Sequence, residues 1–461
     1  MDAVPFLKID PILDDRDTRI IVCCGAGGVG KTTTAAALGV RAAERGRRVV
    51  VLTIDPARRL AQSMGIDALD NTPRRVDGIK GSGPAGASRG DSGEGGGDRG
   101  EGGGELHAMM LDMKRTFDEI VEAHAEPARA RAILENPFYQ SLSAGFAGTQ
   151  EYMAMEKLGQ LRARDEWDLI VVDTPPSRSA LDFLDAPKRL GSFLDGKFIK
   201  LLMAPAKVGG RAGMKFLNVG MSMMTGTLGK LLGGQFLGDV QTFVAAMDTM
   251  FGGFRTRADA TYRLLQAPGT AFLVVASPER DALREAAYFV ERLAAEGMPL
   301  AGLVLNRVHG SGAERLSAER ARAAAENLEE GRIVDQGPGK TGVRGAPATS
   351  SEPSHATAAD SPARPSAASE AAPTADVPEE HPSEDTDPGS APDIARLTAG
   401  LLRLHAERMR VLTREQRTRD RFTALHPEVA VTEVAALPGD VHDLAGLRAI
   451  GERLSSPRER S

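Results

Sequence analysis

The chain has 461 residues, more than one compact core usually holds, which predicts one large α/β domain or two smaller ones with appended segments. Hydrophobic residues make up 41% of the chain, enough for a sizeable core, while aromatic residues make up only 4% and the net charge is −6. The sequence therefore lacks the aromatic surface that binds single-stranded nucleic acid and the basic field that attracts nucleic acid or anionic lipid. We expect no nucleic-acid partner.

Strand and helix patterns alternate along the chain. Apolar, β-rich runs predict strands, and apolar residues at helical spacing predict helices. In chain order these are the strand Thr18–Cys24, the helix Lys31–Arg45, the strands Arg47–Ile54 and Leu106–Leu111, the helix Gln150–Arg164, the strands Leu169–Val172 and Ala271–Ala276, the helix Asp281–Ala295 and the strand Leu300–Leu305. This alternation predicts an α/β fold with a mostly parallel central sheet and helices on both faces.

Two segments interrupt this alternation. Residues 81–105 hold 12 of the 51 glycines, and we expect a flexible surface insertion there. Residues 187–263 hold seven of the 16 methionines, and we expect an inserted helical subdomain. Within it, the stretch Phe216–Gly238 is apolar enough to raise the question of a membrane span. Its six glycines and its polar residues predict no stable membrane insertion.

Low-complexity sequence separates the last part of the chain from the rest. We predict a disordered linker over residues 326–394, because the part from 333 on holds ten of the 27 prolines and no Phe, Trp or Tyr. Order is expected to return with a helix from about Ile394 to Leu412 or beyond, a strand near Val429–Ala436 and a helix over Val441–Leu454. We therefore expect residues 395–461 to complete the core formed by residues 18–325, with residues 1–17 as an N-terminal extension.

The two cysteines, Cys23 and Cys24, are neighbours in a predicted strand. Their side chains should point to opposite faces, which excludes a disulfide between them and favours two small buried core residues. With no CxxC pair, the sequence offers no structural zinc site of that kind. The N-terminal MDAVPFLKID lacks the basic and then apolar pattern of a signal peptide, so we expect a cytoplasmic location.

Residues Gly25 to Thr32 read GAGGVGKT and satisfy the phosphate-binding pattern GxxxxGK[ST]. The motif follows an apolar strand and opens a helix, which is the context that phosphate binding requires. Glycines let backbone N–H groups surround phosphate oxygens, and the helix N-terminus adds a positive dipole end. We predict that Lys31 neutralises the β- and γ-phosphates of ATP and that the Thr32 hydroxyl ligates Mg²⁺. The alternative is a glycine-rich turn that holds no ligand.

Two aspartates end apolar strands near this loop. Asp173 follows Leu169–Val172, where a carboxylate is the expected second partner of Mg²⁺; the alternative is an aspartate that caps a helix. Asp55 follows Arg47–Ile54, and from there its carboxylate would orient or deprotonate the attacking water. The alternative for Asp55 is a plain turn residue before Pro56.

With these motifs the chain resembles the family of the arsenite-pump ATPase (ArsA) and the tail-anchored-protein targeting ATPase, in the dimeric, deviant P-loop class that also holds MinD and ParA proteins. The resemblance is carried by GGVGKTT at 27–33, Asp55-Pro56-Ala57, DTPPSRS at 173–179 and Asn306-Arg307. It implies a P-loop NTPase that binds ATP and Mg²⁺, with Asn306 and the segment Leu437-Pro438-Gly439 on the adenine. The expected catalytic residues are Lys31, Asp55 and Asp173, the expected Mg²⁺ ligands are Thr32 and Asp173, and the expected nucleotide-binding residues are Gly27, Gly28, Val29, Gly30, Lys31, Thr32, Thr33, Asn306, Leu437 and Pro438.

The chain departs from the family pattern at three places. The class has a signature lysine just after the first P-loop glycine, which reaches the partner subunit's nucleotide, and this chain has Ala26 there. Arg58-Arg59 stand where the family usually has His-Ser, and Arg178-Ser179 stand where it has Gly-His. The cysteines that arsenite pumping and a zinc-clasped dimer require are missing, so neither property is implied.

The resemblance implies a dimer whose shape changes with nucleotide. In the first hypothesis, the chain is an ATP-driven carrier, and its Met-rich segment encloses a hydrophobic client or a small-molecule ligand; the alternative is that these methionines pack a helical core. In the second, it is a weakly active or inactive regulatory subunit that forms a heterodimer with a lysine-bearing paralogue. The other possible assembly is a homodimer, in which Arg58, Arg59 or Arg178 takes the role of the missing lysine. A third hypothesis, a membrane-surface ATPase, would use the helix Val441–Leu454, whose apolar stripe fits core packing better.

Overall fold

A computed structural model describes residues 5–54, 59–79, 103–137, 139–140, 149–175, 253, 256–334 and 391–456. The chain divides into two compact units. The first contains the parts up to Gly312 and from Val411 onward, and the second is Ala313–Arg410. The expected methionine-rich subdomain lies outside the described residues apart from 253 and 256–263, as do most of the glycine-rich segment and most of the expected linker.

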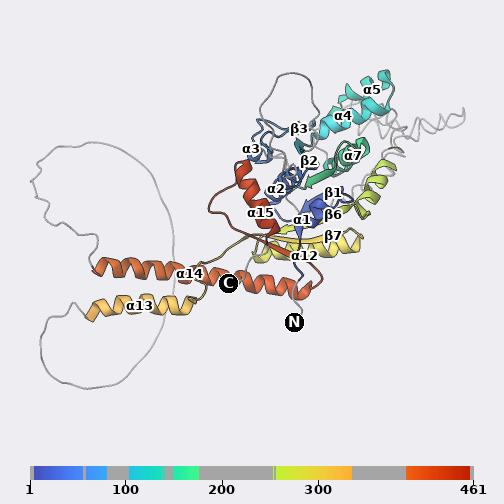
Figure 1. Cartoon of the computed structure of the whole chain (residues 1–461). Coiled ribbons are helices and arrows are strands. Elements are labelled where there is room, and N and C mark those ends of the chain that lie inside the picture. Colours follow the sequence, from blue (N-terminus) through green and yellow to red (C-terminus); the bar gives the residue numbers. More distant parts are fainter. Residues whose placement is uncertain are drawn as a thin grey trace, which may run out of the picture. The chain divides into compact units, whose positions relative to one another are not determined.

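Among the described residues, the first unit is built on an eight-stranded sheet, several of whose strands are labelled in Figure 1. The order of the strands is β3-β4-β2-β5-β1-β6-β7-β8. The strands are β1 (Ile20–Cys24), β2 (Arg48–Thr53), β3 (Arg74–Arg75), β4 (Glu105–Met110), β5 (Leu169–Asp173), β6 (Thr270–Ala276), β7 (Leu300–Val308) and β8 (Val431–Ala435). Every neighbouring pair is parallel except β3 and β4. This confirms the predicted α/β fold with a mostly parallel sheet.

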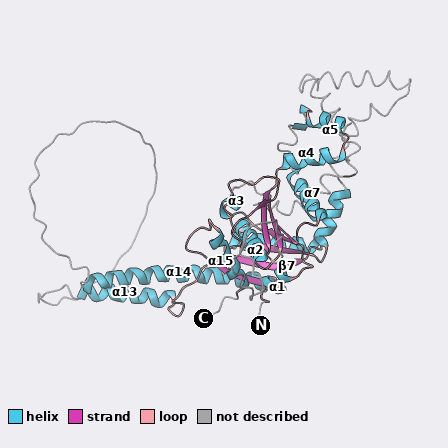
Figure 2. Ribbon diagram, turned by 45° about the horizontal axis from the view of Figure 1, so that its top comes forward, coloured by secondary structure: helices cyan, strands magenta, loops and turns pink. Residues whose placement is uncertain are grey.

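Helices cover both faces of this sheet (Figure 2). One face shares its apolar core with α1 (Ile9–Asp14), α2 (Lys31–Glu44) and α15 (Leu444–Ser455). The other face packs against α4 (Met113–His124), α5 (Pro127–Leu134), α7 (Thr149–Arg164), α12 (Arg280–Ala295) and the helical residues 256–266. Cys23 belongs to the first core and Cys24 to the second, so the two side chains point to opposite faces.

The central strands are buried along their whole length. All positions of β1, β5 and β6 are buried. Parallel strands that are covered on both faces read as continuous apolar runs instead of alternating ones, which explains why the sequence identifies them so readily. The one charged residue in these three strands is Asp173 at the carboxyl end of β5, where it is fully buried. A buried carboxylate at a strand end marks the edge of the sheet at which a site is expected.

The second unit contains α13 (Ala318–Val334) and the first part of α14 (Ala391–Leu425). Within it, Arg403 donates a hydrogen bond of 2.5 Å to Glu329, and Ala321 and Ala399 are buried. Both helices extend into the range expected as linker, because α13 continues to Val334 and α14 starts at Ala391. The alanine- and glutamate-rich sequence of α13 favours a helix, and the proline-rich composition begins only after it. None of the described helices is long and apolar enough to cross a membrane.

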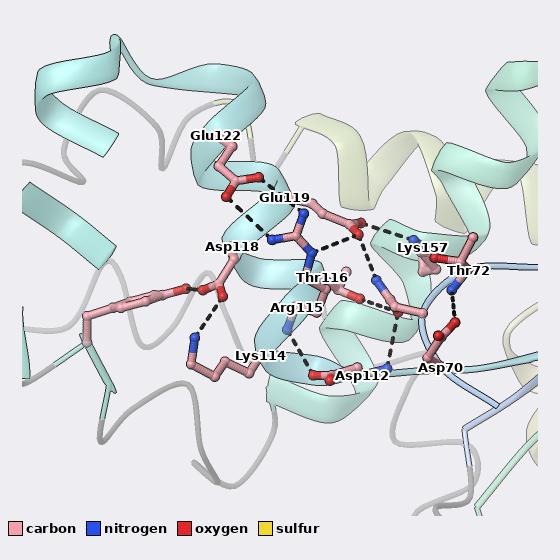
Figure 3. A network of polar contacts seen from close by, with 12 residues as sticks. Asp70, Thr72, Asp112, Lys114, Arg115, Thr116, Asp118, Glu119, Glu122 and Lys157 are labelled. Atoms are coloured by element: carbon pink, nitrogen blue, oxygen red, sulfur yellow. Dashed lines mark hydrogen bonds and ion pairs between the residues drawn. The ribbon is translucent and has the colours of Figure 1, made fainter. Parts of the chain in front are cut away.

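A polar network joins the segment after α3 (Arg59–Ser63) to α4 and α7 (Figure 3). Asn71 accepts a hydrogen bond from Thr116 at 3.1 Å and donates one to Glu119 at 3.2 Å. Lys157 of α7 is buried and donates to the other oxygen of Glu119 at 3.0 Å. Because a buried charge is costly without its partners, these contacts favour a single arrangement of α4 and α7 on the sheet.

Candidate nucleotide-binding site

The loop between β1 and α2 takes a conformation that needs glycine at two positions. Gly30 has φ +95°, and a Cβ atom added there would lie 2.2 Å from the Asn306 amide nitrogen. At Gly25 an added Cβ would lie 2.1 Å from the carbonyl oxygen of Val275. Both the backbone angle and the close neighbours therefore exclude larger side chains. Gly27 and Gly28 lie at the exposed tip of the loop.

Lys31 is the first residue of α2, and its side chain folds back over the loop. Its ammonium group donates a hydrogen bond of 2.7 Å to the backbone carbonyl of Ala26, and the residue is 5% exposed. A lysine held this closely inside its own phosphate-binding motif has lost most of its hydration already. The ammonium is therefore positioned at the loop before any phosphate arrives.

Asp173 is the meeting point of two hydroxyl groups. The Thr32 hydroxyl, at the start of α2, donates to Oδ2 of Asp173 at 2.7 Å. The Thr53 hydroxyl, at the end of β2, donates to the same oxygen at 2.9 Å. The structure therefore brings together Thr32 and Asp173, the two residues predicted to hold Mg²⁺. It also shows a neighbour of Asp173, Thr53, that the sequence did not indicate. Thr53 ends the strand next to β5 in the sheet, and the order of the strands was needed to identify it.

Asn306, near the carboxyl end of β7, lies against the P-loop. Its amide nitrogen donates to the carbonyl oxygen of Val29 at 2.9 Å, and its oxygen accepts from the backbone N–H of Arg307 at 2.9 Å. Arg307 has φ +59°, an uncommon value for a residue other than glycine, and the bond from Asn306 supports this left-handed turn. The side chain of Asn306 thus connects the end of β7 to the phosphate-binding loop.

The remaining predicted residues are placed as follows. Thr33 is half-buried in the first turn of α2. In the loop after β8, Leu437 is half-buried against the core that contains α2, and Pro438 is exposed. Asp55, Arg58 and Arg178 lie outside the described residues.

Burial also changes the pKa of the two cysteine thiols in β1, the strand that leads into the loop. Burial raises the pKa of Cys24 to about 12, with the positive charge of Lys31 opposing the change. Burial and the negative charge of Asp173 raise the pKa of Cys23 well above its usual value. Both cysteines are therefore neutral core residues at physiological pH, in keeping with the interpretation from the sequence.

The donor set suits a phosphate with a hard cation. The Thr32 hydroxyl and the Asp173 carboxylate supply oxygen, the ligand type that Mg²⁺ prefers, and such sites usually combine one or two protein oxygens with phosphate oxygens and waters. The exposed loop tip presents backbone N–H groups at the N-terminus of a 14-residue helix. Lys31 adds the positive charge that phosphate oxygens require.

Comparison with known proteins agrees with this geometry. The family model of the anion-transporting ATPases (ArsA type) matches residues 18–80 and 104–330, well over half of the chain. The matched ranges include Lys31, Asp173 and Asn306 and leave out most of the glycine-rich segment. They also leave out the strand and helix that close the chain, β8 and α15.

Three curated relatives show the same likeness. ATPase GET3 of Podospora anserina is 26% identical over 322 residues, which cover 68% of this chain and 80% of the relative. ATPase GET3 of Malassezia globosa is 28% identical over 189 residues, which cover 41% of this chain and 48% of the relative. ATPase ARSA2 of Chlamydomonas reinhardtii is 25% identical over 342 residues, which cover 71% and 79%. This chain belongs to the family of the ArsA-type anion-transporting ATPases.

Proposed function

We propose that this chain binds Mg-ATP at its P-loop and hydrolyses it. One observation carries the proposal: the Thr32 hydroxyl at the start of α2 lies 2.7 Å from the Asp173 carboxylate at the end of β5, beside the glycine-rich loop. Membership in a family of ATPases supports it. The same two residues would hold Mg²⁺, which neutralises charge on the transferred phosphoryl group when it is bound.

In this proposal the phosphates lie against the loop Gly27–Gly30 and the first turn of α2, which includes Thr33. Lys31 exchanges its bond to the Ala26 carbonyl for bonds to β- and γ-phosphate oxygens. This exchange costs little additional desolvation because the folded protein already buries the lysine. A phosphate oxygen is also a stronger acceptor than a neutral carbonyl, so the exchange favours the bound state.

Asn306, Leu437 and Pro438 are proposed to contact the adenine. An amide carries two N–H donors and an oxygen with two lone pairs, so the bonds to Val29 and Arg307 leave Asn306 with capacity for a base edge. The bond to Val29 also places this residue beside the loop that would hold the phosphates.

Asp55 is proposed to orient or deprotonate the attacking water. An Asp55→Asn variant keeps the shape of the side chain but removes its charge and its basicity, so we expect Mg-ATP affinity within about twofold of the unchanged protein and turnover about 100-fold lower. Calorimetric titration and a phosphate-release assay measure the two quantities. Unreduced turnover would mean that Asp55 is a plain turn residue.

The nucleotide cycle is proposed to change the shape of a cytoplasmic dimer that acts on a hydrophobic client or a small-molecule ligand. The support is the methionine-rich composition of residues 187–263, because methionine suits adaptable apolar surfaces. The alternative is a weakly active or inactive subunit of a heterodimer with a lysine-bearing paralogue. Ala26 favours that alternative, since its buried methyl group offers no cation to a partner's nucleotide.

A further inference from the structure

Thr53 occupies a fixed place beside the proposed Mg²⁺ site. It ends β2, is 1% exposed and pairs in register with Asp173 of the neighbouring strand β5. Its hydroxyl donates to Oδ2 of Asp173 at 2.9 Å, the oxygen that also accepts from Thr32 at 2.7 Å. Two hydroxyls from different elements thus converge on one carboxylate oxygen.

The backbone around Thr53 is held on both sides. Its carbonyl oxygen accepts a hydrogen bond from Leu111 after β4 at 2.9 Å, and the N–H of Ile54 donates to the Asp173 carbonyl at 3.0 Å. Threonine is branched at Cβ, which restricts its first side-chain torsion. The sheet therefore holds the backbone that carries the Thr53 hydroxyl, and few orientations are open to the side chain.

The two hydroxyls differ in what they can do once a nucleotide is bound. Thr32 belongs to the phosphate-binding motif, so its oxygen would ligate the metal while its hydrogen points to Asp173. Thr53 belongs to β2, outside the phosphate-binding motif, and its hydroxyl donates to Asp173 of the neighbouring strand. Groups that orient a metal-binding carboxylate in this way commonly change metal affinity by about 10- to 100-fold when they are removed.

We propose that Thr53 is a positioning residue for the metal site: its hydroxyl fixes the Asp173 carboxylate in the orientation that receives Mg²⁺ together with Thr32. This inference rests on the proposed Mg-ATP function. It does not require Thr53 to touch the metal, the nucleotide or the attacking water.

The test compares full-length Thr53→Val, which removes the hydroxyl, with Thr53→Ser, which keeps it. ATP binding is titrated by calorimetry with EDTA and then at a series of Mg²⁺ concentrations. In EDTA, we expect the ATP affinity of Thr53→Val to lie within about twofold of that of the unchanged protein. The Mg²⁺ concentration that gives half of the metal-dependent gain in ATP affinity should be about tenfold higher in the variant. Thr53→Ser should need the same Mg²⁺ concentration as the unchanged protein within about twofold.

Thr432→Val is the matched control, because Thr432 is also a buried strand threonine, whose hydroxyl donates to Leu454 at 3.3 Å. It should change thermal stability but not the Mg²⁺ dependence, and Thr53→Ala repeats the test if Thr53→Val does not fold. An Mg²⁺ dependence in Thr53→Val equal to that of the unchanged protein would overturn the role of Thr53. If the unchanged protein binds ATP with no gain from Mg²⁺, or does not bind ATP, the proposed function fails as well.

Discussion

At the residue scale, the candidate site depends on the hydrogen bonds that a fully buried carboxylate, Asp173, accepts. Removing Asp173 from water disfavours its charge, and the hydroxyls of Thr32 and Thr53 offset part of that cost by donating to it. Hydrogen bonds to a charged group contribute about 1.5–3 kcal/mol each. The two hydroxyls therefore hold the Asp173 carboxylate in place at the carboxyl end of β5.

The two buried cysteines give a prediction about pH and about thiol reactivity. Burial raises the pKa of both thiols, so the folded protein keeps them protonated at pH values near 9, at which the thiols of an unfolded chain ionise. A group whose pKa is raised by folding lowers stability as pH rises above its unfolded pKa. We expect negligible reaction of the native protein with a thiol reagent at pH 8 and reaction of both cysteines after unfolding in denaturant. Rapid reaction of the native protein would contradict the burial of the cysteine side chains.

Part of this site could be predicted from sequence alone. The P-loop is a local pattern of eight residues, so Lys31 and Thr32 were identified directly, and Asp173 was identified because it ends an apolar run. Thr53 could not be found in this way, because its bond to Asp173 depends on β2 lying next to β5 in the sheet. No local pattern encodes which strands become neighbours.

At the scale of elements, an acidic residue near the N-terminus ties three helices together. Asp10 of α1 accepts two hydrogen bonds from Arg41 of α2, at 2.6 and 2.7 Å, and one from Ser455 of α15 at 2.6 Å. These bonds, with Arg41 contributing most, lower the pKa of the Asp10 carboxyl to about 2, against the opposing effect of partial burial. The helices α1 and α15 are thereby fixed to α2, the helix that begins at the P-loop.

Asp10→Asn should lower the free energy of unfolding by about 1–2 kcal/mol at pH 7, a value discounted because the carboxylate is partly exposed. A carboxyl whose pKa is lowered by folding contributes stability above its unfolded pKa, near 3.8, and loses it as pH falls through about 2. Denaturant unfolding at pH 7 and at pH 2 measures both limits. Asp14→Asn is the control, because Asp14 is more exposed and, in the part of the chain that the structure describes, forms its ion pair with Arg45 alone, so its effect should be smaller. Equal losses in the two variants would contradict the role of Asp10 in joining α1, α2 and α15.

The predictability of the elements follows from their surroundings. The buried strands are continuous apolar runs, and the helices α7 and α12 show apolar residues at helical spacing. Their bounds agree with the sequence prediction within two residues, except that β7 continues three residues beyond the predicted Leu305 to Val308. The helix α13 was assigned in part to a linker because its alanine-rich face carries little apolar contrast. The edge strand β3 has two residues and no apolar pattern, so nothing in the sequence announces it.

At the scale of the whole molecule, Ala26 stands where the class has its signature lysine, and this bears on whether the chain works as a homodimer or with a paralogue. The resemblance to the deviant P-loop class implies that a lysine from the neighbouring subunit meets the charge that develops on the transferred phosphoryl group. An arginine finger, which plays the corresponding role in other ATPases and GTPases, contributes about 10³–10⁵ in rate. Two copies of this chain would bring Ala26 to both sites. A lysine-bearing paralogue would supply the cation to this chain's nucleotide alone.

Ala26→Lys tests this interpretation. If the protein depends on a partner's lysine, turnover of the variant by itself should rise by at least about tenfold, because each copy then supplies the cation to the other. Phosphate release measures the rate, and calorimetry with Mg-ATP checks that the loop still binds nucleotide. If the unchanged protein is already fast without a partner and the turnover of the variant lies within about twofold of it, the result would instead favour Arg58, Arg59 or Arg178 in the role of the missing lysine.

The central claim is that Lys31 and its loop bind Mg-ATP, and calorimetric titration of Lys31→Ala tests it most directly. The account predicts tight Mg-ATP binding by the unchanged protein and a loss of several kcal/mol, at least about 100-fold in affinity, in the variant, because a charge-assisted contact to phosphate is removed. Lys114→Ala is the control, since Lys114 is an exposed lysine of α4 paired with Asp118, and its affinity should not change. Equal affinity of Lys31→Ala and the unchanged protein would contradict the account.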